Sequence, residues 1–189
     1  DRRAAAGGAH RPRPDGRDGM TAPLMTAAKI AGGHIVALSG GKDSTAMALR
    51  LSEIEPREYT YLITPTGNEL PDMNRHWERL ECLLGKPMVR LSTHTLSSLI
   101  TIQQCLPNHR MRWCTRMLKI EPCIRWIRER QPCVLYVGLR ADEEERKGIY
   151  DSDVIPDFPL RRWGWGVDDV WAYLRDREIV VPKRTDCAW

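Results

Sequence analysis

Residues 34–44 read His-Ile-Val-Ala-Leu-Ser-Gly-Gly-Lys-Asp-Ser, and this stretch decides the fold. The apolar run at residues 34–38 predicts a short buried strand, and apolar residues at helical spacing predict a helix over residues 44–54. Between them, two adjacent glycines let the backbone curl tightly and approach a ligand without a Cβ in the way. The sequence therefore predicts a strand, a tight loop and a helix, in that order.

The loop at residues 39–44 combines several features of a phosphate site. Free N–H groups and the positive end of the helix dipole would face a bound anion at the start of the helix. The two commonest nucleotide loops, G-x-x-x-x-G-K-[ST] and G-x-G-x-x-G, are absent, so the alternative is an ordinary glycine-rich turn that caps the helix. The loop's place between strand and helix favours phosphate binding. The residues predicted to bind phosphate are Ser39, Gly40, Gly41, Lys42, Asp43, Ser44 and Thr45.

Short apolar runs alternate with helical patterns along the rest of the chain, which is typical of βαβ units around a parallel sheet. The fold class is therefore α/β, with one domain over residues 20–189 built on a five-stranded, mainly parallel sheet flanked by helices. In such sheets ligands bind beyond the carboxyl ends of the strands, where several polar clusters lie. Further strands are predicted at residues 59–64, 88–91, 134–137 and 160–163, and helices at residues 21–31, 72–84, 96–106, 115–120, 124–130 and 167–176.

A basic segment lies between residues 110 and 130. It holds seven Lys and Arg residues against two Glu, a surplus that predicts an anionic partner. Arg116 and Lys119 are three residues apart, so on an α-helix they would share a face and could grip sulfate or phosphate oxygens. Arg140 follows a predicted strand, where a ligand phosphate would lie. The alternative for all three side chains is a solvated basic surface.

Cys114 lies beside Arg112 and Arg116 at the predicted start of a helix. Neighbouring positive charge and a helix N-terminus both favour a thiolate, which can act as a nucleophile or a metal ligand. Three other thiols lie within apolar patterns and are expected to be inert in the core: Cys82, Cys123 and Cys133.

Several segments in matching order resemble the PP-loop nucleotide α-hydrolase superfamily, and within it the phosphoadenylyl-sulfate (PAPS) reductase family. Together they cover most of residues 34–182. The resemblance implies a single Rossmann-like domain that binds an adenine nucleotide with its phosphates on the loop. The segments are SGGKDS, the turn Thr66-Gly-Asn-Glu-Leu-Pro71, the cysteine segment Arg112–Pro122, Gly138-Leu-Arg140 with Arg146, and Trp163–Leu174. The further nucleotide-binding residues that the resemblance implies are Glu69, Gly138, Arg140 and Arg146.

The activity that the resemblance implies is reductive release of sulfite from PAPS, with Cys114, Arg116 and Lys119 as the catalytic residues. Such an enzyme needs a thioredoxin-like thiol donor. One alternative is an ATP pyrophosphatase that adenylates tRNA or DNA for thiolation, in which Asp43 would help to bind Mg²⁺. A second alternative is a nucleotide-binding module without catalytic activity. Glu69 could hold a ribose hydroxyl or a metal, or it could cap its own turn.

The cysteines depart from the family's pattern in two ways. Reductases with an iron–sulfur cluster have paired cysteines where Trp113 here precedes the single Cys114, and the tail that holds the reductase's nucleophilic cysteine is expected to be truncated. Cys187 could be the first cysteine of a further pair. In that case Cys105, Cys114, Cys187 and one neighbour would supply four thiolates for a [4Fe–4S] cluster.

The chain has 189 residues, of which 42% are hydrophobic and 29% charged, and this is enough for one domain with a buried core. Residues 1–19 lack a hydrophobic period and are expected to form a flexible tail. No apolar run approaches the roughly 20 residues of a membrane-spanning helix, and a secretory signal is absent, so a cytoplasmic protein is expected. The expected partners are a small-molecule nucleotide and no membrane, and a homodimer is compatible with the sequence.

Overall fold

The structure is a computed structural model, which describes residues 33–108, 110–143 and 153–184. The tail predicted at residues 1–19 and the helix predicted at residues 21–31 lie outside these ranges. Within them, no helix has both the length and the apolar character needed to cross a membrane.

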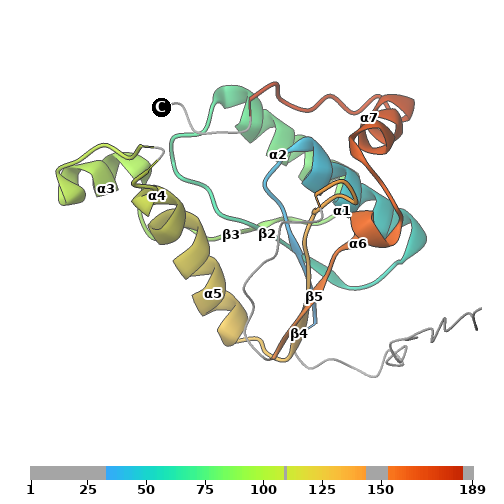
Figure 1. Cartoon of the computed structure of the whole chain (residues 1–189), viewed down its shortest axis with the longest axis horizontal. Coiled ribbons are helices and arrows are strands. Elements are labelled where there is room, and N and C mark those ends of the chain that lie inside the picture. Colours follow the sequence, from blue (N-terminus) through green and yellow to red (C-terminus); the bar gives the residue numbers. More distant parts are fainter. Residues whose placement is uncertain (1–32, 109, 144–152, 185–189) are drawn as a thin grey trace, which may run out of the picture.

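One parallel sheet forms the centre of the molecule (Figure 1). Its strand order is β3-β2-β1-β4-β5, and each neighbouring pair is parallel. This confirms the predicted α/β class with a five-stranded parallel sheet. The strands are β1 (His34–Ala37), β2 (Tyr59–Ile63), β3 (Val89–Arg90), β4 (Cys133–Tyr136) and β5 (Val154–Asp157).

Helices cover both faces of the sheet because the strand residues alternate between two apolar faces. Val36 packs into the cluster with α1, α2 and α7, whereas its neighbour Ile35 packs on the opposite face beside Ile127 of α5. In Figure 1, α1, α2, α6 and α7 gather on one side of the sheet and α5 lies on the other. The helices are α1 (Lys42–Ile54), α2 (Pro71–Leu84), α3 (Leu96–Gln103), α4 (Trp113–Thr115), the π-helix η1 (Arg116–Ile120), α5 (Glu121–Arg128), α6 (Pro159–Arg162) and α7 (Val167–Asp176).

The prediction of the last strand is wrong. Residues 160–163 belong to α6 and the turn after it, and the fifth strand lies earlier, at Val154–Asp157. Pro156 conceals this strand in the sequence, because proline cannot donate to a ladder. It is tolerated here because β5 is an edge strand, paired only with β4. Pro159 then occupies the first turn of α6, where a missing N–H costs nothing.

One cysteine also differs from its prediction. Cys133 is buried in β4 and Cys123 of α5 is partly buried, but Cys82 on α2 is exposed. Cys82 lies in an apolar pattern of an amphipathic helix, and the buried face of α2 is narrower than that pattern predicts.

The strand order places a ligand crevice at a definite point of the sheet. From β1 the chain builds outward through β2 and β3, and it then returns to the other side of β1 to add β4 and β5. The connections after β1 and β4 therefore leave the sheet in opposite directions. Ligands of doubly wound sheets bind at such a switch point, beyond the carboxyl ends of the strands.

Candidate functional site

A cavity of about 380 Å³ lies at this switch point. Its walls come from the segments that follow three neighbouring strands: the loop and first turn of α1 after β1, the turn from Thr64 to Glu69 after β2, and Val137–Leu139 after β4. Two buried side chains of α2 and Lys119 of η1 complete the lining. Segments that are far apart in the sequence are therefore brought together by the parallel order of the strands.

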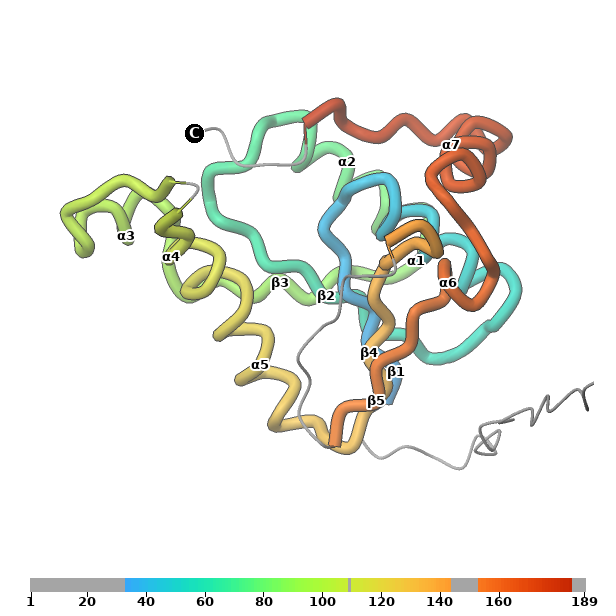
Figure 2. Tube along the Cα trace, viewed as in Figure 1, coloured from blue at the N-terminus to red at the C-terminus, as the bar shows by residue number. Residues whose placement is uncertain are grey.

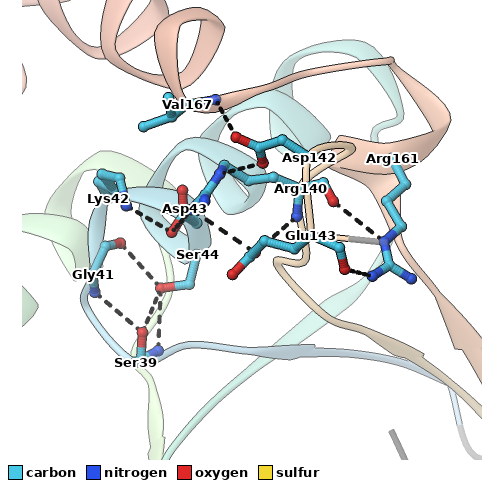
Figure 3. Close-up of polar contacts among 10 residues, drawn as sticks. All are labelled: Ser39, Gly41, Lys42, Asp43, Ser44, Arg140, Asp142, Glu143, Arg161 and Val167. Atoms are coloured by element: carbon cyan, nitrogen blue, oxygen red, sulfur yellow. Dashed lines mark hydrogen bonds and ion pairs between the residues drawn. The ribbon is translucent and has the colours of Figure 1, made fainter. Parts of the chain in front are cut away.

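The loop after β1 is held in shape by its own hydroxyl groups (Figure 3). The hydroxyl oxygens of Ser39 and Ser44 lie 3.0 Å apart, and the Ser44 hydroxyl donates to the Gly41 carbonyl oxygen at 3.1 Å. The Gly41 N–H in turn donates to the Ser39 hydroxyl at 3.2 Å. α1 begins at Lys42, two residues before the predicted start, so the N–H groups of its first turn face the cavity end of the loop.

Gly40 is required by both conformation and space. Its φ is +81°, in the left-handed region that favours glycine. A Cβ at this position would lie 2.6 Å from Met73 Sδ and 2.6 Å from Trp77 Nε1, and both of these side chains are buried. The loop therefore rests directly on α2.

Glycine is required at position 138 for a different reason, because two backbone segments approach each other closely there. A Cβ there would lie 3.1 Å from the Ser44 nitrogen and 3.2 Å from the Ser44 Cα. Glycine thus lets the end of β4 reach the first turn of α1 and narrows the crevice from that side.

Charged side chains form a network at the mouth of the loop (Figure 3). Asp43 Oδ2 accepts from Lys42 Nζ at 3.0 Å and from Arg140 Nη1 at 3.0 Å. Arg140 also contacts Asp142 at 2.8 Å and Glu143 at 3.8 Å. Burial alone would lower the pKa of Arg140, but its hydrogen bonds to Asp43 and Asp142 outweigh burial and raise that pKa. Arg140 therefore holds Asp43 and the segment after β4 together, whereas the sequence suggested contact with a ligand phosphate.

The Asp43 carboxylate is only half satisfied. Its second oxygen, Oδ1, is buried and has no hydrogen-bond partner among the described residues. A buried carboxylate oxygen without a donor is costly unless a ligand or ion supplies one.

Thr45 does not face the cavity. It is fully buried, and its hydroxyl lies 3.1 Å from His76 Nε2 of α2. The prediction that Thr45 adds a phosphate donor is therefore not supported by this geometry. Burial, and next the charge of Arg79, lower the pKa of His76, so a neutral imidazole partners the hydroxyl.

We expect Thr45→Val to lower the free energy of unfolding by about 1–3 kcal/mol, because valine has the same shape but leaves His76 Nε2 unpaired. Nucleotide affinity should stay within about twofold, since no ligand contact is lost. Chemical denaturation and calorimetric titration measure the two quantities. The control is Ser44→Ala, which removes a loop hydroxyl and should weaken nucleotide binding. Equal losses of affinity in both variants would mean that Thr45 does reach the ligand.

Glu69 caps its own turn. Its carboxylate accepts from the Thr66 hydroxyl at 2.7 Å and from the Gly67 N–H at 3.0 Å. Of the roles considered from the sequence, this geometry favours the capping role. The carboxylate also lines the cavity, so the turn that it fixes forms part of the wall.

The basic segment contains an unexpected π-helix. η1 spans Arg116–Ile120 and leads directly into α5, where Pro122 lies in the first turn. A π-helix pairs residues five apart, so Arg116 and Lys119 do not share a face as they would on an α-helix. Lys119 lines the cavity, whereas Arg116 pairs with Glu121 at 3.4 Å and its side chain is 67% exposed.

Cys114 is not part of the cavity lining. It is partly buried against the small cluster that Leu96, Leu99 and Leu118 form between α3 and η1. Two other predicted residues, Arg146 and Cys187, lie outside the described residues. In the part of the chain that the structure describes, no group of three or more His, Cys, Asp or Glu side chains is placed to hold a metal ion. A [4Fe–4S] cluster would therefore depend on Cys187 and stays a prediction.

Sequence reasoning missed several residues of the cavity wall, among them Met73 and Trp77 of α2. The sequence indicates only that Trp77 belongs to the apolar face of a helix, yet both residues are 5% exposed or less and line the cavity. The available signal was that Met73 and Trp77 are four residues apart in the predicted helix that follows the turn at Thr66. Residues at this spacing lie on the same helical face, which can face the loop. The Trp77 indole N–H has no hydrogen-bond partner among the described residues.

Comparisons with known proteins agree with this architecture. A family model described as the phosphoadenosine phosphosulfate reductase domain matches residues 33–183. A curated protein of Methanocaldococcus jannaschii, whose own function is uncharacterized, is 25% identical over 150 residues. That match covers 74% of this chain but 31% of the relative, so the chain spans about a third of the relative's length.

Two solved structures share the fold. A phosphoadenylyl-sulfate reductase from Candida auris, solved as a phosphate complex, superposes with a TM-score of 0.62 at 15% identity, covering 79% of this chain and 73% of that one. The U34-tRNA thiolase NcsA from Methanococcus maripaludis, solved with its [4Fe-4S] cluster, gives a TM-score of 0.54 at 17% identity, covering 85% and 61%. At such identities the similarity shows the fold alone.

Proposed function

Because the chain belongs to the phosphoadenosine phosphosulfate reductase domain family, we propose that it is an enzyme that binds an adenine nucleotide in the loop cavity and releases sulfite reductively from PAPS. The observation that supports this proposal most strongly is the cavity. Its volume of about 380 Å³ lies within the roughly 300–1,000 Å³ typical of small-ligand sites. It also combines a glycine loop and a helix start with a lysine on another wall, which suits a phosphorylated ligand.

The bound nucleotide would place its phosphates on the N–H groups of the loop at residues 40–44, at the start of α1. Lys119 reaches the same cavity from η1, and its ammonium would then neutralise oxygens at the sulfate end. Gly40 keeps the loop against α2, and Gly138 keeps the end of β4 against the first turn of α1, so the phosphates would be enclosed between these walls.

In the proposed reaction a cysteine thiolate attacks the sulfur of PAPS. An S–S bond forms as the S–O bond breaks, and adenosine 3′,5′-bisphosphate leaves with the electron pair. A dithiol donor of the thioredoxin type then reduces the S-sulfonated cysteine, releasing sulfite and becoming a disulfide. Cys114 is the candidate nucleophile, five residues before Lys119 on the same helical segment. Because Cys114 does not line the cavity, α4 would have to move toward the bound sulfate for this attack to occur.

The second candidate function is adenylation of an acceptor by ATP with release of pyrophosphate. The observation that favours it is the unpartnered Asp43 Oδ1 beside the loop, which has no donor within the described residues. Carboxylate oxygens are ligands that Mg²⁺ prefers, and Mg²⁺ accompanies ATP. In this case the acceptor would be tRNA or DNA.

Calorimetric titration of the full chain distinguishes the two candidates. We expect PAPS to bind at least about tenfold more tightly than ATP with Mg²⁺, because the sulfate end would contact Lys119. Sulfite release with a reduced thioredoxin-type donor would then test the chemistry. A preference for ATP that requires Mg²⁺, with pyrophosphate released, would replace the first function by the second. Binding of neither nucleotide would overturn both.

A further inference from the structure

A second hollow of about 710 Å³ lies on a neighbouring face of α2. One wall is α2, and the other is the segment after α7, residues 180–184, which runs back past α2 (Figure 2). We call it the α2 groove. It begins at Leu70, the residue after Glu69, so it starts where the nucleotide cavity ends. Met73 and Trp77 line the cavity, whereas Arg75 and Arg79 line the groove.

The groove is strongly cationic although the chain as a whole carries a net charge of only +4. Among the described residues that line it, Arg75, Arg79, Lys183 and Arg184 are cationic and Asp72 is acidic. Charge of one sign in a concave surface attracts ligands of the opposite sign more strongly than the same charge on a flat surface.

The described contacts of Arg75 and Arg79 leave much of the charge of these two side chains available to a ligand. Arg75 pairs with Asp72, but the two side chains are 70% and 71% exposed, and such surface pairs contribute little. Arg79 uses one guanidinium nitrogen to donate to the Glu178 carbonyl oxygen at 3.2 Å, which ties the returning segment to α2. A carbonyl oxygen carries no net charge, so this bond leaves the positive charge of Arg79 in place.

We propose that the α2 groove binds the phosphate backbone of a single-stranded RNA segment. Arg75 and Arg79 are one helical turn apart, about 6 Å along the axis, which is of the order of the spacing between consecutive phosphates of a strand. Lys183 faces them from the opposite wall, so a strand would lie between two rows of cations. Electropositive grooves that follow a backbone are the usual sites for single strands.

Two features favour RNA over an acidic polypeptide or DNA. The wall opposite α2 carries apolar residues, Val180, Val181 and Pro182, next to Lys183, which suits sugar and base faces between phosphates. Asp72 would repel phosphate and carboxylate groups, but its carboxylate can accept from a 2′-hydroxyl, which DNA lacks. The groove goes beyond the proposed function, and a strand bound there would have one end beside the nucleotide cavity.

The test compares two variants of the full chain with equal charge changes. Arg75→Glu with Lys183→Glu reverses both walls of the groove, and the control, Arg112→Glu with Arg125→Glu, reverses two exposed cations of the basic segment. The probe is a labelled single-stranded RNA of ~20 nucleotides, measured by fluorescence anisotropy over a salt series. We expect the groove variant to lose about tenfold or more in affinity and about 1.4 units of salt slope, and the control to lose much less.

Each other outcome overturns the proposal. Equal losses in both variants would place the RNA on the basic segment, or make the binding non-specific. Equal affinity for single-stranded DNA of the same sequence would remove the preference for RNA, and competition by polyglutamate at equal charge would indicate an acidic protein partner. Absence of RNA binding by the unmodified chain would also overturn it. Titration of the groove variant with PAPS and ATP separates this outcome from failure of the proposed function, because the cavity is unchanged.

Discussion

Gly40→Ala is expected to lower nucleotide affinity by at least about 100-fold and the free energy of unfolding by about 2–5 kcal/mol. Two costs add at this position. A left-handed φ of +81° costs an L-residue roughly 1–2 kcal/mol, and the new Cβ would lie 2.6 Å from Met73 Sδ and Trp77 Nε1. Overpacking of a filled core typically costs a further 1–3 kcal/mol. Because both side chains are buried, the loop must move, and its N–H groups then leave the positions that would bind phosphate.

Gly85→Ala is the matched control for this effect. Gly85 lies at the C-terminal end of α2, the helix that Gly40 contacts, and its φ is +65°. A Cβ at Gly85 would have no atom within 4 Å. We expect it to cost about 1–2 kcal/mol of stability and no nucleotide affinity. Calorimetric titration and denaturant unfolding of both variants separate the two costs. If Gly40→Ala kept the affinity of the unmodified chain, the loop would not be the phosphate site.

Most of the fold could be predicted from the sequence because the hydrophobic period of each segment agrees with the type of element that the α/β fold requires there. The strand at residues 34–38 and the helix after it are both apolar at the right period, and the five-stranded parallel sheet followed from their alternation. β5 was missed because Pro156 breaks the period of a strand that only an edge position permits. The order of the strands is a property of the whole sheet, so no local sequence pattern predicts it.

The candidate site was predictable in part, for a related reason. The loop at residues 39–44 is contiguous, so its shape follows from its own glycines and hydroxyls. Arg140 lies beside this loop, but its pairing with Asp43 spans 97 positions of the chain, and no local spacing predicts it. The side chains of Arg116 and Lys119 point in different directions because η1 is a π-helix, and no residue in this segment predicts a π-helix.

Lys119→Ala is expected to weaken PAPS binding by about 10–100-fold while changing AMP binding by less than about threefold. A hydrogen bond to a charged group contributes about 1.5–3 kcal/mol, and every 1.4 kcal/mol is about tenfold in affinity. Lys119 lines the cavity from η1, on a different wall from the loop, so it would contact groups beyond the first phosphate. Calorimetric titration with PAPS, ATP and AMP measures the dependence on ligand charge.

Arg116→Ala is the control for Lys119→Ala, and it tests the π-helical geometry of η1 at the same time. If the segment were a regular α-helix, the two side chains would share a face and both substitutions would weaken PAPS binding together. In the observed geometry Arg116 is exposed and paired with Glu121, so its loss should change affinity by less than about threefold. Equal losses would show that the segment rearranges when a nucleotide binds, and equal loss of AMP and PAPS in Lys119→Ala would place that lysine at the first phosphate instead.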